Sequence, residues 1–154
     1  MDLKLGDKAP AFKLATDNGG EVSLSALKGS PFVLYFYPRD STPGCTKEAV
    51  NFSAFAKKFH DIGVTVIGLS KDSPESHDSF KAKHDLKLTL ASDPETKIAQ
   101  DYGVWVEKTL YGKKSMGMER ATFLIDGGGK IRAIWRKVKV DGHAEAVLAA
   151  AKQL

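Results

Sequence analysis

Two short apolar runs, rich in β-branched and aromatic residues, constrain this chain more than any other feature. They are PFVLYFY, residues 31–37, and VTVIGLS, residues 64–70. Neither run alternates with polar residues, which is typical of strands that are covered on both faces. Residues 43–60 lie between them, and their apolar side chains recur at helical steps of three and four. These side chains are Ala49, Phe52, Phe55, Ala56 and Phe59. A strand, a helix and a second strand in this order predict a parallel β-α-β unit.

The flanking segments extend this unit at both ends. Residues 9–27 predict two short strands around a turn at Asp17–Gly20, because Asp, Asn and Gly tolerate turn geometry. After residue 70 we expect a helix to about His84, capped by Asp72 or Ser73 with Pro74 at its first position. Further elements follow in order: a strand KLTLAS, a helix over 97–102, a hairpin of strands 121–125 and 130–135, and a helix from Gly142 to the end. The apolar stripe of this last helix comprises Ala144, Val147, Leu148, Ala151 and Leu154.

This order predicts an α/β fold compatible with a thioredoxin-like domain. We expect a central mixed β-sheet flanked by helices, with an N-terminal β extension. A length of 154 residues suits one core, so we expect a single domain over residues 1–154.

Composition excludes several functional classes. The net charge is +4 and the lysines are spread along the chain, which argues against nucleic-acid binding. No apolar stretch approaches the roughly 18 residues of a membrane span, and the N-terminus lacks the apolar core of a signal peptide. A single cysteine allows no intramolecular disulfide, which fits a reducing, cytoplasmic location.

Other motifs predict no metal or cofactor site. YGKKSMG lacks the spacing of a phosphate-binding loop, and DGGGK joins two predicted strands as a hairpin turn. No Gly-x-Ser-x-Gly elbow is present. The four histidines, at positions 60, 77, 84 and 143, lack zinc-site spacing and are interpreted as surface residues.

The single cysteine, Cys45, lies in the stretch STPGCT at a predicted helix start. Thr42 is a good N-cap residue and Pro43 suits the first helical position, so Cys45 falls in the first turn. The backbone N–H groups and the positive helix end there stabilise a thiolate. Gly44 leaves room for a small substrate. An inert, buried cysteine remains the alternative, but this context favours a reactive thiol.

The chemistry open to this thiol is narrow. Thr42 occupies the C-x-x-C position, so the chain cannot cycle a disulfide alone, and no histidine signature supports a Cys-His hydrolase. A lone thiolate can attack a peroxide O–O bond and become a sulfenic acid. The leaving oxygen then requires a nearby cation. Arg120 opens the strand RATFLID at a position from which it can reach the helix start. The other arginines are Arg39, Arg132 and Arg136.

YFYPRDSTPGCT resembles the peroxidatic signature Pro-x-x-x-Thr/Ser-x-x-Cys of peroxiredoxins. TPGCTKEA resembles the peroxiredoxin Q, or bacterioferritin comigratory protein, subfamily, as do GDKAPAF, VIGLSKDSPESHDSF, LASDP, DYGVW and ERATFLID in the same order. The resemblance implies a thioredoxin fold and thiol-dependent reduction of hydroperoxides. It implies that Cys45 is the peroxidatic nucleophile and Thr42 a hydrogen-bond donor to the peroxide. It also implies that Arg120 is the cation beside the thiolate and that Pro38 shields the pocket.

One departure from the subfamily decides how the cycle closes. Many members carry a resolving cysteine five residues after the first, where this chain has Val50, and other members place it near residue 80. The chain thus resembles a single-cysteine member whose sulfenate is reduced by an external thiol: glutathione, a glutaredoxin or a thioredoxin. The resemblance also implies a monomer. A redox sensor without turnover, or a chaperone-like binder, remains an open alternative, because both need the same activated thiol.

Overall fold

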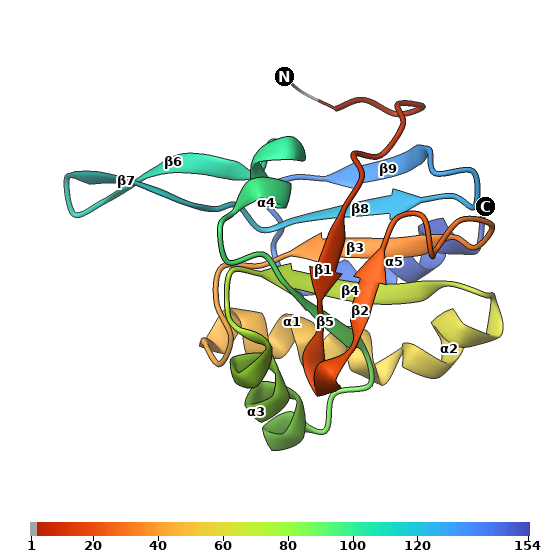
Figure 1. Cartoon of the computed structure of the whole chain (residues 1–154), viewed down its shortest axis with the longest axis horizontal. Helices are drawn as coiled ribbons and strands as arrows, with labels where there is room; N and C mark the ends of the chain where they lie inside the picture. The colour runs from red at the N-terminus through yellow and green to blue at the C-terminus, as the bar shows by residue number, and fades with distance from the viewer. Residues whose placement is uncertain (1–2) are drawn as a thin grey trace.

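The computed structural model describes residues 3–154, and a five-stranded sheet in the order β5-β4-β3-β8-β9 forms its centre (Figure 1). Its strands are β3 (Phe32–Phe36), β4 (Thr65–Ser70), β5 (Thr89–Ser92), β8 (Ala121–Ile125) and β9 (Ile131–Trp135). β4 pairs in parallel with β3 and β5, whereas β8 pairs antiparallel with β3 and β9. The predicted mixed sheet is confirmed.

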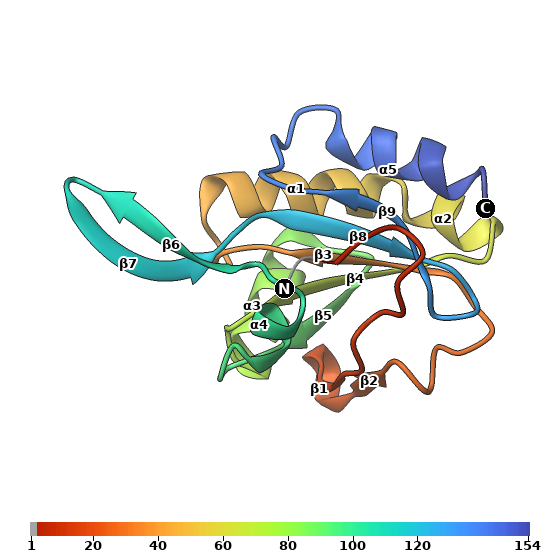
Figure 2. The same ribbon diagram turned by 90° about the horizontal axis from the view of Figure 1, so that it is seen from above.

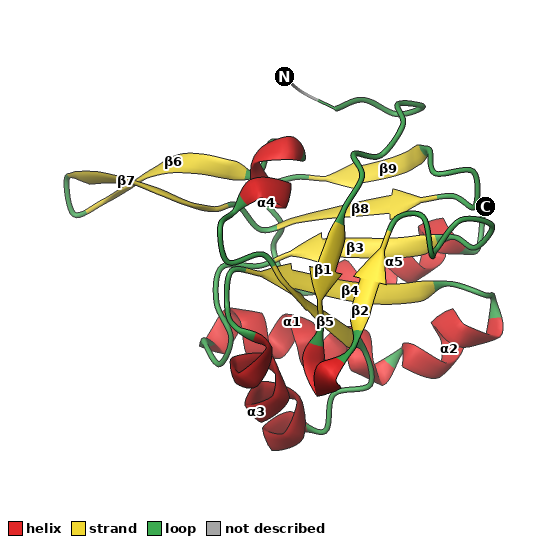
Figure 3. Ribbon diagram, viewed as in Figure 1, coloured by secondary structure: helices red, strands yellow, loops and turns green. Residues whose placement is uncertain are grey.

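Helices and a small hairpin cover the two faces of this sheet. The helices are α1 (Pro43–Ala54), α2 (Ala56–Asp61), α3 (Pro74–His84), α4 (Lys97–Asp101) and α5 (His143–Ala151). α1, α2 and α5 lie on one face, and the hairpin of β1 (Lys13–Ala15) and β2 (Glu21–Ser23) lies with α4 on the other (Figures 2 and 3). This hairpin is the predicted N-terminal β extension, and a short 3-10 turn, Asp17–Gly19, closes it.

The two-sided burial of β3 explains why its sequence contains only aliphatic and aromatic residues. Val33 and Tyr35 face the core that contains α1, α2 and α5. Phe32, Leu34 and Phe36 face the core on the other side of the sheet, which includes α4 and the N-terminal segment. All five side chains are at most 1% exposed, so both sets of alternating positions are apolar.

Two expectations about helices were wrong. The segment 43–60 does not form one helix, because the backbone leaves helical geometry at Phe55 (φ −99°, ψ 8°) and α2 begins at the next residue. Leu154 lies beyond the end of α5 and is 43% exposed, whereas the other four residues of the predicted stripe are buried. By contrast, α3 begins as predicted, with the Ser73 side chain accepting a hydrogen bond from the Ser76 amide.

A second hairpin was not predicted. It consists of β6 (Trp105–Leu110) and β7 (Lys113–Met118) and projects from the body of the molecule (Figure 1). Tyr111 and Gly112 form its two-residue turn, both with positive φ (52° and 76°), as a type I′ turn requires. Among residues 3–154, no helix has the length and apolar character needed to cross a lipid bilayer.

Candidate active site

Cys45 lies in the first turn of α1, directly after the central strand β3 and the loop 37–42. Pro43 begins the helix, and the Cys45 side chain is a free thiol that is 2% exposed. The N–H groups at the start of a helix have no intrahelical acceptors, and the helix dipole is positive there. The predicted position of Cys45 in the first turn of a helix is confirmed.

Arg120 is the arginine whose guanidinium meets this thiol. Its Nη2 donates to Cys45 Sγ at 3.4 Å, and its side chain is 17% exposed. The contact follows from sheet register: β8 begins at Ala121, which pairs with Phe36 at the end of β3. The side chain of the residue before β8 therefore reaches the start of the helix that follows β3.

Two other arginines have different partners. Arg132 contacts Asp126 beside the β8–β9 turn, and Arg136 forms an ion pair with Glu119. That neither side chain takes part in the chemistry of Cys45 stays a prediction.

Glu48 is a site residue that sequence reasoning missed. It lies three positions after Cys45 on the same helix, is 1% exposed, and accepts a 2.7 Å hydrogen bond from Arg120 Nη1. Burial raises the pKa of this carboxyl to about 7, although Arg120 acts in the opposite direction. Among the described residues, Glu48 Oε2 has no hydrogen-bond partner. A charged residue one turn from the cysteine, within an apolar stripe, was the available signal.

Thr42 and Gly44 are placed as expected but make different contacts. Thr42 is the N-cap residue of α1 by position, yet its hydroxyl donates to the Arg39 carbonyl at 2.9 Å and makes no capping hydrogen bond. A Cβ atom on Gly44 would lie 3.1 Å from Arg120 Nη2, so the missing side chain makes room for the guanidinium. Pro38 is half-buried in the preceding loop, and Val50 is 42% exposed on α1.

The interpretation of all four histidines as surface residues was wrong for two of them. His77 is fully buried and His143 is 7% exposed. His143 Nε2 lies 2.7 Å from the Thr122 hydroxyl, and burial, with a smaller contribution from Arg120, lowers its pKa to about 4. This ring is therefore neutral near neutral pH. Among residues 3–154, no group of three or more His, Cys, Asp or Glu side chains is arranged to hold a metal ion.

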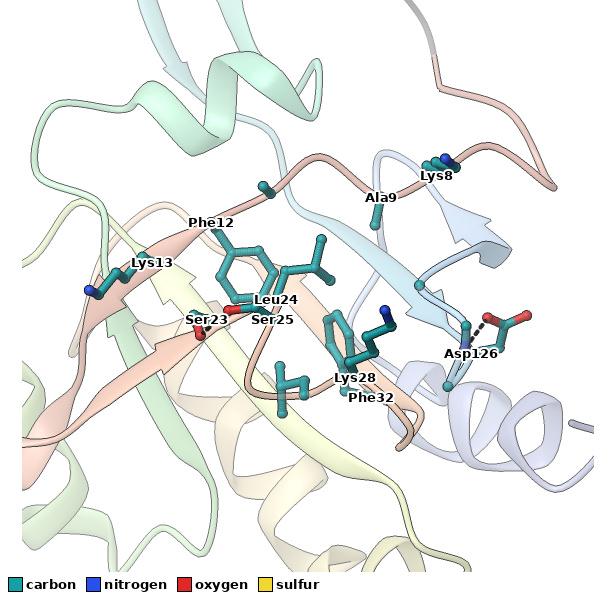
Figure 4. A pocket seen from close by; sticks show the side chains of 15 residues that line it. Lys8, Ala9, Phe12, Lys13, Ser23, Leu24, Ser25, Lys28, Phe32 and Asp126 are labelled. Carbon is teal, nitrogen blue, oxygen red and sulfur yellow. Dashed lines mark hydrogen bonds between the residues drawn. The ribbon is translucent and has the colours of Figure 1, made fainter.

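A separate cavity of about 420 Å³ has no residue of the thiol site in its lining (Figure 4). Phe12, Leu24 and Phe32 line it, together with Lys8, Lys28 and the glycines of the β8–β9 turn. Phe32 begins β3, whereas the loop to Cys45 leaves the other end of that strand. This cavity and the thiol site are therefore at opposite ends of the sheet.

Comparison with known proteins assigns the family. Residues 5–134 match the family model described as AhpC/TSA. The chain belongs to the AhpC/TSA family. A putative peroxiredoxin bcp of Coxiella burnetii is 51% identical over 148 residues, which cover 96% of this chain and 98% of that protein. Peroxiredoxin Bcp of Bacillus subtilis is 46% identical over 154 residues, which cover 100% of this chain and 98% of that protein.

Solved structures agree with this assignment. A mutant of Xylella fastidiosa PrxQ superposes with a TM-score of 0.93 at 38% identity, covering 99% of this chain and 98% of that one. The bacterioferritin comigratory protein of Xanthomonas campestris, whose alkyl peroxide reduction has been studied, gives a TM-score of 0.88 at 44% identity, with 92% and 90% coverage. The predicted thioredoxin-like peroxiredoxin fold and the predicted subfamily are confirmed.

Proposed function

We propose that this protein is a thiol-dependent peroxidase that reduces hydrogen peroxide and organic hydroperoxides through Cys45. The observation that carries the proposal is the contact of Cys45 Sγ with Arg120 Nη2 at a helix start. Its relatives, named peroxiredoxins, support peroxide as the substrate and a thiol as the reductant.

The first half of the cycle oxidises the thiol. The Cys45 thiolate attacks one peroxide oxygen, an S–O bond forms and the O–O bond breaks. The departing oxygen leaves with the electron pair and takes up a proton, which gives water or an alcohol. Arg120 stabilises the negative charge that develops on this oxygen, as preorganised donors do in other sites.

Thr42 and Pro38 complete the pocket in this proposal. The Thr42 hydroxyl donates its one proton to the Arg39 carbonyl. The lone pairs of the Thr42 oxygen are therefore available to accept a hydrogen bond from a peroxide O–H. Donation from Thr42 to the peroxide, as the family resemblance implies, requires the hydroxyl to rotate away from Arg39. Gly44 leaves room beside the Arg120 guanidinium, and we expect Pro38, half-buried in the preceding loop, to limit the access of water.

The second half of the cycle needs an external thiol, because the chain has one cysteine. One thiol attacks the sulfenic sulfur and releases water, leaving a mixed disulfide. A second thiol attacks this disulfide and restores Cys45. We propose glutathione, a glutaredoxin or a thioredoxin as the donor, in a cytoplasmic monomer whose residues 1–154 act as one domain. Residues 1 and 2 lie outside the described part of the chain.

The decisive experiment compares the parent with Cys45→Ser in steady-state peroxide consumption. With excess dithiothreitol, the parent should turn over many times, whereas the serine variant should be inactive because its hydroxyl is a far poorer nucleophile. Without reductant, the intact mass of the parent should gain one oxygen. Consumption that stops after one equivalent despite excess thiol would instead support the redox-sensor alternative.

A further inference from the structure

A buried polar cluster lies beside the loop that leads to Cys45, and the proposed reaction does not use it. The Asp40 carboxylate is its centre, with 3% of its side chain exposed. Its Oδ1 accepts from the Tyr37 hydroxyl at 2.5 Å, and its Oδ2 accepts from the Ser76 hydroxyl at 2.8 Å. His77 Nδ1 lies 2.7 Å from the same Oδ2. Both carboxylate oxygens are thus occupied by donors.

His77 uses both of its ring nitrogens in hydrogen bonds. Its Nε2 lies 2.9 Å from the Ala91 carbonyl, which only accepts, so Nε2 donates. Its Nδ1 forms a hydrogen bond with the Asp40 carboxyl group at 2.7 Å. Burial opposes ionisation of Asp40, but its hydrogen bonds, led by that with His77, lower its pKa. His77 and Asp40 therefore form a buried hydrogen-bonded pair.

This hydrogen-bonded pair fastens the loop before α1 to the start of α3. The backbone N–H of Asp40 also donates to Asp72 Oδ2 at 2.8 Å, and the Ser70 hydroxyl holds that carboxylate at 2.7 Å. The loop needs such fastening because Ser41, the next residue, has a left-handed backbone (φ 64°) that a non-glycine residue adopts reluctantly. The chain then reaches Thr42 and the first turn of α1.

The same loop leads directly into the first turn of α1, which carries Cys45. Cys45 is 2% exposed, so a protein or tripeptide thiol needs the surrounding chain to move before it can reach the sulfur. We propose that this movement involves loop 37–42 and the first turn of α1, and that His77 is a positioning residue whose hydrogen bond with Asp40 latches the loop. The latch favours peroxide attack and limits how often Cys45 becomes accessible to the reducing thiol. This inference rests on the proposed function.

The test measures two rates on the full chain. One is sulfenate formation with hydrogen peroxide, and the other is labelling of Cys45 by the bulky reagent dithiobis-nitrobenzoate. In His77→Leu, which leaves the Asp40 charge without its partner, we expect labelling to accelerate and sulfenate formation to slow, each by about tenfold or more. A general loss of stability would also expose Cys45, so the two rates are compared with those of a variant that is destabilised elsewhere in the fold.

Matched variants keep the proposal open to refutation. Ile131→Ala removes a fully buried side chain from the other core and should lower thermal stability without raising the labelling rate. Tyr37→Phe and Ser76→Ala each remove one donor to Asp40 and should give intermediate rates, which covers the case in which His77→Leu does not fold. Equal labelling in the parent, Tyr37→Phe and Ser76→Ala, or equal acceleration in Ile131→Ala, would overturn the latch. Labelling does not depend on turnover, so a parent inactive toward peroxide would refute the proposed function alone.

Discussion

Arg120→Ala tests the proposed catalytic contact and separates it from the structural role of the same side chain. The guanidinium contacts Cys45 Sγ at 3.4 Å and Glu48 Oε1 at 2.7 Å. Loss of one charged donor to the transition state should slow sulfenate formation about 10²- to 10³-fold. Stopped-flow measurement of peroxide-driven oxidation gives this rate, and Arg132→Ala, whose side chain contacts Asp126, is the matched control.

The variant should also change how stability depends on pH. In the parent, the pKa of Glu48 is raised from 4.5 to about 7, mainly by burial. Its ionisation in the fold therefore costs about 3 kcal/mol. A raised carboxyl pKa means that stability is highest below pH 4.5 and falls as the pH rises to about 7. Without Arg120 the pKa rises further, so the decline should continue above about pH 7. Urea unfolding from about pH 5 to about pH 9 measures this.

The double variant Arg120→Ala/Glu48→Gln separates the two roles. A glutamine does not ionise, so the pH-dependent loss of stability should disappear. The peroxide rate should stay low, because the donor beside Cys45 is still missing. If the double variant recovers the parental rate, Arg120 acts by neutralising Glu48 and not on the reacting oxygen, and the catalytic assignment is wrong.

Three further predictions follow from the same region. Gly44→Ala should raise helix stability by up to about 1 kcal/mol but slow peroxide attack, because its Cβ would lie 3.1 Å from Arg120 Nη2; unchanged kinetics would contradict this. Tyr35→Phe should be neutral or stabilise the fold by about 1 kcal/mol in thermal unfolding, since the buried Tyr35 hydroxyl has no partner among the described residues. Val50→Cys should form an intrachain disulfide after peroxide treatment, visible in a non-reducing digest, if the first turns of α1 unwind. Sulfinic acid at the parental rate would show that they do not.

The elements that could be predicted from sequence are those with a local cause. The buried strands of the sheet are predicted by apolar runs in the sequence. The start of α1 is predicted by Thr42 and Pro43 alone, without information from any other segment. The β6–β7 hairpin lacks such a signal, because most of its side chains are exposed and no apolar face repeats. The break between α1 and α2 at Phe55 also has no signal in the sequence, since neither glycine nor proline occurs there.

The buried histidines show the second limit. His77 is buried because Asp40, 37 positions away, and the Ala91 carbonyl satisfy both ring nitrogens. His143 is buried because Thr122, 21 positions away, faces its Nε2. A polar side chain is buried where hydrogen-bond partners are available to it. Those partners come from distant segments through tertiary contacts, so the neighbouring sequence does not predict them. Glu48 follows this rule with one of its oxygens, because Arg120 donates to Oε1 whereas Oε2 has no partner among the described residues.

The contact between Cys45 and Arg120 lies between these two cases. The residues are 75 positions apart, so no local pattern relates them. However, an antiparallel pairing of β3 with β8 brings the end of one strand beside the start of the other, and the register pairs Phe36 with Ala121. α1 follows the first of these ends and Arg120 immediately precedes the second. Any chain with this pairing therefore brings the residue before β8 close to the helix start, and the sequence specifies only that this residue is a cation. A shift of one residue in the register would direct the guanidinium to the opposite face of the sheet, away from α1 and the thiol.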